Sequence, residues 1–148
     1  MITIHIIVPD AARAAEWYAT VLGAEERGRI ILPDGRLIEL ELWFGTSRVM
    51  LADEFPEHGA LSPKTTGGTS AVFYLDTTDV NALWARALDH GAEVLRPLAD
   101  WFTGERDGHI IDPFGHRWGL SQRIRDVPRE EVSRGAAEFF GGTSGGGR

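Results

Sequence analysis

The same order of predicted elements occurs twice along the chain, and this repetition limits the possible folds more than any other feature. The first half contains a predicted strand at residues 3–8, a helix at 11–22, and strands at 29–32, 37–44 and 48–52. The second half contains a strand at residues 70–75, a helix from Asp79 to His90, and strands at 93–95, 108–111 and 117–121. Because a repeated supersecondary unit normally reflects the architecture, the sequence predicts two tandem βαβββ modules.

The boundaries between these parts follow from composition. Residues 1–125 form one predicted domain, with modules at 1–55 and 68–125 and a linker at 56–67 that is rich in Pro, Gly and Thr. A C-terminal helix is predicted over 126–140, starting near Pro128, where the missing backbone donor is harmless. Residues 141–148, GGTSGGGR, are expected to be a disordered tail, because they have nothing to bury.

Composition excludes several classes of function. The 148-residue chain has no cysteine, which rules out disulfide frameworks, thiolate nucleophiles and cysteine-ligated zinc. A formal net charge of -7 without a dense Lys/Arg run argues against a nucleic-acid partner. No secretory leader is visible and no apolar run is long enough to span a membrane, so a cytoplasmic protein is expected.

Two segments carry a resemblance to a known family. They are PDAARAAEWYATVLGAEE at residues 9–26 and DPFGHRWGL at residues 112–120. With the doubled order of elements, they resemble the vicinal oxygen chelate superfamily, which includes glyoxalases, bleomycin-resistance proteins and extradiol dioxygenases. The resemblance covers about residues 3–125 and implies an α+β fold. In that fold the two modules curve their mixed sheets into a shared trough that holds the ligand, and many members are homodimers.

The DPFGH segment is interpreted as a structural turn. Asp112-Pro113-Phe114-Gly115 has the composition of a hairpin turn, in which Pro fixes one φ angle and Gly can take a positive one. His116 beside it is expected to be a turn or packing residue. The motif therefore positions the last strand and performs no chemistry.

Alternation along the strands predicts which side chains face the trough. Along residues 38–44, Ile38, Leu40, Leu42 and Phe44 would pack against the helices, and Glu39, Glu41 and Trp43 would face the trough. The same alternation places these further residues in the trough: Thr3, His5, Ile7, Ser70, Val72, Tyr74, Arg117, Gly119 and Ser121.

The resemblance also implies where a metal would be bound. Metal-dependent members take one ligand from the first strand and one from a later strand of each module, usually His and Glu. These positions fall near Thr3 or His5, near Glu39 or Glu41, at Ser70 and at Gly119. Only one or two of them can bind a cation, whereas a catalytic metal generally needs three protein ligands. The other histidines, His58, His90 and His109, lie outside the family's positions, so no metal or other cofactor is predicted, with a divalent metal as the alternative.

Polar and aromatic residues supply the candidate site. His5 could pair with Glu39 or Glu41 and act as a general base, bind a polar group, or serve only structure. Trp43 and Tyr74 offer flat surfaces suited to an aromatic compound. Trp101, Phe102 and Arg106 lie in a predicted loop, DWFTGERDG, that would border the mouth of the trough.

Two functions of different classes follow. The first is a protein that binds a small, aromatic organic molecule and sequesters it, as in antibiotic resistance of the bleomycin-resistance type. The second is an enzyme, a lyase, isomerase or dioxygenase, that depends on a metal or on a His5/Glu39 acid–base pair. The first is preferred, because the metal ligands are missing.

Overall fold

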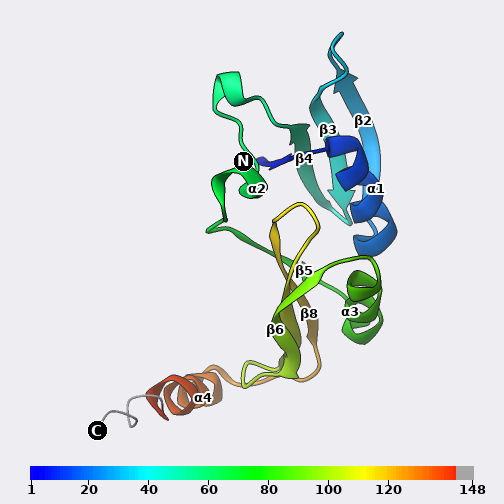
Figure 1. Ribbon diagram of the computed structural model, residues 1–148. Coiled ribbons are helices and arrows are strands. Elements are labelled where there is room, and N and C mark those ends of the chain that lie inside the picture. The colour runs from blue at the N-terminus through cyan, green and yellow to red at the C-terminus, as the bar shows by residue number, and fades with distance from the viewer. Residues whose placement is uncertain (143–148) are drawn as a thin grey trace, which may run out of the picture.

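The chain folds into two modules of the predicted kind (Figure 1), seen in a computed structural model that describes residues 1–142. The first module contains β1 (Ile4–Val8), α1 (Ala11–Leu22), β2 (Glu25–Ile31), β3 (Leu37–Phe44) and β4 (Ser47–Asp53). The second contains β5 (Val72–Asp76), α3 (Val80–Asp89), β6 (Glu93–Asp100), β7 (Glu105–Ile111) and β8 (Arg117–Arg123). A 3-10 turn (Pro56–His58) and the short helix α2 (Pro63–Thr66) connect the modules, and α4 (Arg129–Gly141) follows them.

Each module forms its own four-stranded mixed sheet. The strand orders are β1-β4-β3-β2 and β5-β8-β7-β6, so β1, β2, β5 and β6 are edge strands. In each sheet the first strand runs parallel to the last one, and the other pairs are antiparallel. The predicted α+β fold with two βαβββ modules and a C-terminal helix is confirmed.

Two edge strands are longer than the sequence pattern indicated. β2 begins at Glu25 and β6 continues to Asp100, and both pair with their neighbours through shifts in register. Pro97 lies inside β6, where an edge position with bulges accommodates the missing backbone donor. As a result β7 starts at Glu105, and Arg106 belongs to a strand and not to the predicted loop.

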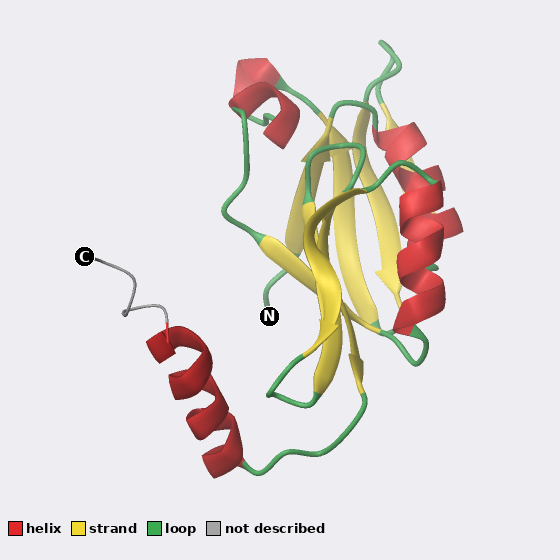
Figure 2. Cartoon of the chain, turned by 60° about the horizontal axis from the view of Figure 1, so that its bottom comes forward, coloured by secondary structure: helices red, strands yellow, loops and turns green. Residues whose placement is uncertain are grey.

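One core joins both modules. Helix α1 packs on the face of the first sheet that carries Leu40, Leu42 and Leu51, and these residues share a cluster with Ile110 and Leu120 of the second sheet. Figure 2 shows helices packed along one side of the strands, whereas the C-terminal helix α4 lies apart from the sheets. Among residues 1–142, no helix has the length and apolar character needed to cross a membrane.

One predicted core residue is wrong. Ile38 is 46% exposed, because the register shift opposite Ile30 and Ile31 leaves it without a partner in β2. Leu37 takes the buried position in its place and is 4% exposed.

The DPFGH turn links the modules as well as turning the chain. Asp112 is 2% exposed and accepts hydrogen bonds from the hydroxyl of Tyr18 in α1 and the indole N–H of Trp118 in β8. Its second carboxylate oxygen accepts the backbone N–H groups of Phe114 and His116. Burial and the neighbouring Asp112 carboxylate raise the pKa of Tyr18 well above its ordinary value, which keeps the hydroxyl protonated as a donor.

The predicted tail begins too early. Gly141 is still part of α4, and the remainder of the tail, residues 143–148, lies outside the described residues.

Candidate functional site

The face of the first sheet that points away from α1, here called the first outer face, carries the sequence-predicted residues of that module. The pairing of β1, β4, β3 and β2 places His5, Met50, Glu41 and Gly28 in one row across it. Glu39 and Glu41 line a shallow hollow of about 270 Å³ together with Met50 and residues of β2.

The structure does not bring His5 and the two glutamates into a pair. Met50 lies between His5 and Glu41 in the register, because β4 and not β3 is the neighbour of β1. The carboxylate of Glu41 instead accepts the indole N–H of Trp43 at 2.6 Å, and within residues 1–142 no hydrogen bond joins His5 to Glu39 or Glu41. The guanidinium of Arg27 lies 4.5 Å from the centre of the Trp43 ring.

The side chains at the expected ligand positions do not fit a metal ion. In the first sheet, Met50 lies between His5 and Glu41, and in the second sheet the expected position at Gly119 has no side chain that could bind a cation. Ser70 precedes β5 and is exposed. Over the part of the chain that the structure describes, no group of three or more His, Cys, Asp or Glu residues is arranged to hold a metal ion. Absence of a metal stays a prediction, which elemental analysis of purified protein tests.

The outer face of the second sheet carries a hydrogen-bonded cluster that the sequence alone did not reveal. In the equivalent row across this sheet lie Tyr74, Gly119, His109 and Arg96. The hydroxyl of Tyr74 is 2.6 Å from Nε2 of His109, and the guanidinium of Arg117 contacts Nδ1 of the same ring at 2.7 Å and 3.1 Å. His109 lies on β7 and is 6% exposed, and side chains from β5 and β8 hold its ring on both nitrogens.

The hydrogen-bond partners of His109 determine its protonation. A guanidinium can only donate, so Nδ1 must accept from Arg117 and the ring proton resides on Nε2. Burial lowers the pKa of His109 below its ordinary value of 6.5, and the nearby Arg96 and Arg117 lower it further. The imidazole is therefore neutral at pH 7 and donates to the Tyr74 oxygen. The hydroxyl proton of Tyr74 is therefore free to be donated to another acceptor.

Gly119 makes this arrangement possible. The ring of Tyr74 crosses β8 directly above Gly119, and a Cβ atom there would lie 2.6 Å from Cε1 of the tyrosine. A larger residue at 119 would push the ring off the sheet and away from His109.

Arg96 connects this cluster to an aromatic group at the end of the sheet. Its guanidinium pairs with Asp107 at 2.7 Å and lies 4.3 Å from the centre of the Trp101 ring. Trp101 and Phe102 occupy the turn between β6 and β7, as predicted, and both rings contact Phe139 of α4. Arg106 is directed elsewhere, since it forms an exposed ion pair with Asp100 at 2.6 Å.

His109 could have been found from the sequence. The Asp112–His116 turn fixes the pairing of β7 with β8, and counting outward from it places His109 opposite Gly119. Alternation within single strands placed Tyr74, Arg117 and Gly119 on this face, but only pairing across the hairpin adds the histidine.

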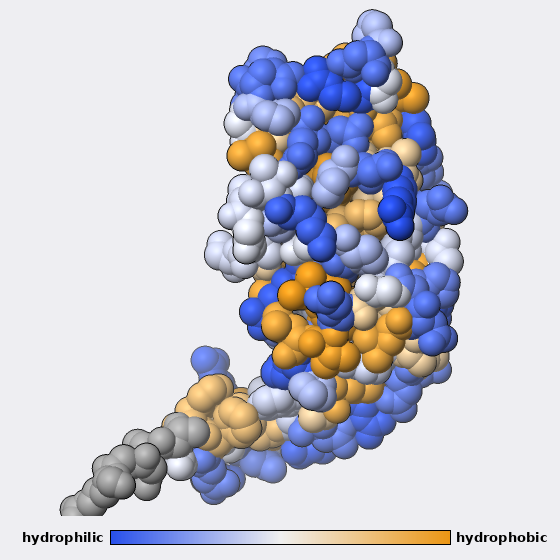
Figure 3. Space-filling model, viewed as in Figure 1, coloured by the Kyte–Doolittle hydropathy of each residue, from blue (hydrophilic) through white to orange (hydrophobic). Residues whose placement is uncertain are grey.

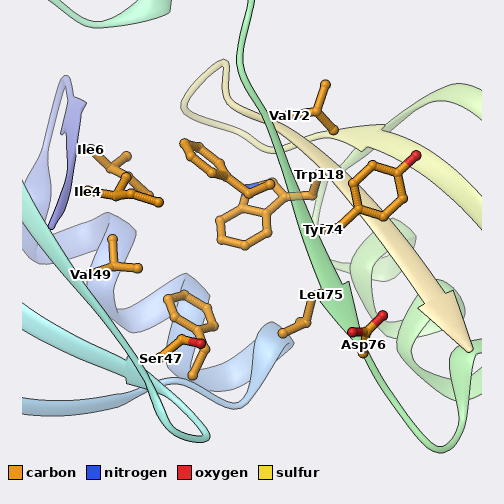
Figure 4. A pocket seen from close by; sticks show the side chains of 11 residues that line it. Ile4, Ile6, Ser47, Val49, Val72, Tyr74, Leu75, Asp76 and Trp118 are labelled. Carbon is orange, nitrogen blue, oxygen red and sulfur yellow. The ribbon is translucent and has the colours of Figure 1, made fainter. Parts of the chain in front are cut away.

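A cleft of about 400 Å³ separates the edge strands β1 and β5 on the side opposite to His5 (Figure 4). Its lining is mainly apolar, and Ile4, Val49, Leu75 and Trp118 contribute to it. Figure 3 shows apolar side chains gathered in the middle of the molecule, around this junction of the two sheets.

Comparisons with known proteins agree with this architecture. The family model described as Glyoxalase/Bleomycin resistance protein/Dioxygenase superfamily matches residues 2–120. An uncharacterized protein of Mycobacterium bovis is 40% identical over 131 residues, which is 86% of each chain. A glyoxalase family protein from Bacillus cereus superposes with a TM-score of 0.69 at 18% identity, covering 84% of this chain and 94% of that one. A member of the same superfamily from Sphaerobacter thermophilus gives a TM-score of 0.60 at 20% identity, covering 81% and 94%.

Proposed function

The chain belongs to the glyoxalase/bleomycin resistance protein/dioxygenase superfamily, and from this premise we propose that it binds a small aromatic organic molecule on the outer faces of its sheets. The use we propose for this binding is sequestration, as in the antibiotic-resistance branch of the superfamily, without a metal cofactor. Small-molecule sites combine apolar and aromatic surface with a few fixed polar groups, and the second outer face has this composition.

The observation that carries the proposal is the cluster of Tyr74, His109 and Arg117. Tyr74 is 56% exposed, yet its hydroxyl is fixed by a buried histidine. Such a fixed polar group at an open surface contributes little to folding, because water would satisfy it equally well. Aromatic surface from Trp101 lies at the end of the same sheet face.

Sequestration is preferred to catalysis for two reasons. Of the expected metal positions, Ser70 and Gly119 offer no cation ligand of the family's kind, so the His5 and glutamate positions alone fall short of the three protein ligands that a catalytic metal generally needs. The acid–base alternative requires a carboxylate to orient His5, but within residues 1–142 no hydrogen bond joins His5 to Glu39, and Glu41 is engaged by Trp43.

We further propose that a second copy of the chain covers the cleft between β1 and β5. Both strands have one unpaired edge, and Ile4 in the cleft is 43% exposed. The resulting homodimer should sediment at twice the chain mass of 16.3 kDa, and Ile4→Glu should reduce it to a monomer by burying a charge in the contact. A wild-type protein that sediments as a monomer at micromolar concentration would contradict this arrangement.

The binding function is tested with a panel of aromatic antibiotics. Tryptophan fluorescence detects binding, and calorimetry then measures the affinity of each compound that changes the emission. Trp43→Ala and Trp101→Ala each remove an aromatic surface from one outer face. The variant on the occupied face should weaken binding about fivefold, the value of one aromatic contact. Trp17→Phe is the control, because Trp17 lies in α1 and bonds to the carbonyl of His90. An emission that no compound changes, or an affinity that neither variant alters, would count against the proposal.

A further inference from the structure

We propose that Tyr74, His109 and Arg117 bind the carboxylate of an aromatic acid. This inference rests on the proposed function and specifies the chemical class of the ligand. It follows from the direction of the hydrogen bonds, from the local charge and from the surface beside the cluster.

The cluster has hydrogen-bond donors that no acceptor in the described residues satisfies. The neutral His109 donates through Nε2 to the Tyr74 oxygen, so the Tyr74 O–H is available to donate outward. Arg117 uses its Nε and one Nη group on Nδ1 of His109, and the remaining guanidinium N–H groups have no partner in the described chain. A group that accepts from both the phenol and the guanidinium therefore fits best.

The cluster contains a cation without a counterion. Arg96 on β6 is neutralised by Asp107 on β7, whereas half-buried Arg117 on β8 has no carboxylate partner among residues 1–142. By register three further acids share this face: Asp76 of β5 opposite Ser121, Glu93 of β6 opposite Ile111, and Glu105 of β7 opposite Arg123. Glu105 pairs with Arg123 at 2.6 Å, and among residues 1–142 neither Asp76 nor Glu93 pairs with Arg117. A half-buried cation without a counterion gains most from an anionic ligand, and a guanidinium matches the planar geometry of a carboxylate.

The surface beside the cluster is apolar enough to receive a ring. Val72 pairs with Arg117 in the register and lies on the same face, next to the ring of Tyr74. A flat ligand that places its carboxylate between Tyr74 and Arg117 would thus rest its ring against β5.

The test compares 1-naphthoate with its neutral analogue 1-naphthamide by calorimetry at pH 7.5. We expect naphthoate to bind at least about tenfold more tightly, which is the order of a hydrogen bond to a charged group. Tyr74→Phe and Arg117→Gln should each lower naphthoate affinity about tenfold and change naphthamide affinity less than about twofold. Arg106→Gln is the matched control, because Arg106 belongs to the same sheet but pairs with Asp100 at 2.6 Å.

Nitrogen NMR of labelled histidine gives a second readout that a purely structural role would not produce. In the free protein His109 should carry its proton on Nε2 and titrate below 6.5. Bound naphthoate adds a negative charge beside Arg117, so it should raise the pKa of His109 toward its ordinary value. The charged and titratable groups that face this ring are Tyr74, Arg96, Arg117 and Asp107. The two arginines lower the pKa of His109, and the negative charge of bound naphthoate offsets their effect.

Each outcome separates this inference from the proposed function. Equal affinities for the two probes, no binding of naphthoate at millimolar concentration, or an unchanged affinity in Tyr74→Phe would overturn the carboxylate site. Those results would leave open the capture of neutral aromatic compounds, which the Trp43→Ala and Trp101→Ala variants test independently.

Discussion

Replacing Asp112 by alanine should lower the free energy of unfolding by about 3 kcal/mol or more, although the residue touches no candidate ligand site. The change leaves four donors without an acceptor: the Tyr18 hydroxyl, the Trp118 indole and two backbone N–H groups of the turn. Unsatisfied buried groups cost about 1–3 kcal/mol each, and water that enters recovers part of this. Urea denaturation followed by circular dichroism measures the loss.

An asparagine at this position should have an intermediate effect. Its amide oxygen can still accept the two N–H groups of the turn, but its amide nitrogen then faces the Trp118 indole, which can only donate. The graded order of wild type, Asp112→Asn and Asp112→Ala would separate the hydrogen bonds from the volume of the side chain.

The hairpin of the first module provides the matched control. Its turn has the same backbone bonds, from Leu32 N to Arg36 O and from Gly35 N to Leu32 O, so Leu32 occupies the position of Asp112. Asp34 in that turn is exposed and pairs with Arg36, so Asp34→Ala should destabilise the protein much less than Asp112→Ala does. An Asp112→Ala variant as stable as Asp34→Ala would show that the buried carboxylate does not hold the modules together.

Asp112 also shows how far the sequence predicts the fold. The sequence Asp-Pro-Phe-Gly predicts the turn, because those residues have local backbone preferences. It does not predict the hydrogen bond from Tyr18 to Asp112, since this bond joins residues 94 positions apart and depends on how α1 meets the second sheet. The predicted ranges for the edge strands β2 and β6 are too short for a related reason: the bulges in these strands interrupt the alternation on which strand prediction relies.

The candidate site was predictable to a similar degree. Alternation placed the aromatic and charged residues on the correct faces, because it needs only one strand at a time. The pairing of His5 with a glutamate required the strand order, and the parallel contact of β1 with β4 inserts Met50 between them. Whether any of these residues binds a ligand stays a prediction.

Gly119→Ala should remove the carboxylate site. Gly119 takes the place in the second sheet that Met50 takes in the first, and only a glycine there lets the ring of Tyr74 cross β8. The new Cβ would lie 2.6–2.8 Å from three carbon atoms of the Tyr74 ring, so the ring must leave the sheet and lose its bond to His109. We expect naphthoate affinity to fall at least about tenfold, as in Tyr74→Phe. The free energy of unfolding should change much less, because Tyr74 lies on an edge strand and is 56% exposed.

Two controls isolate the steric cause of that loss. Gly28 lies on the outer face of the first sheet, and a Cβ atom added there would have nothing within 4 Å, so Gly28→Ala should leave naphthoate binding unchanged. In a Tyr74→Ala background the added methyl group meets no ring, and Gly119→Ala should then have no further effect on binding. A Gly119→Ala protein that keeps both its naphthoate affinity and the His109 signal of the wild type would mean that Tyr74 reaches the ligand without crossing β8. In that case the phenol, and not its contact with the histidine, would define the site.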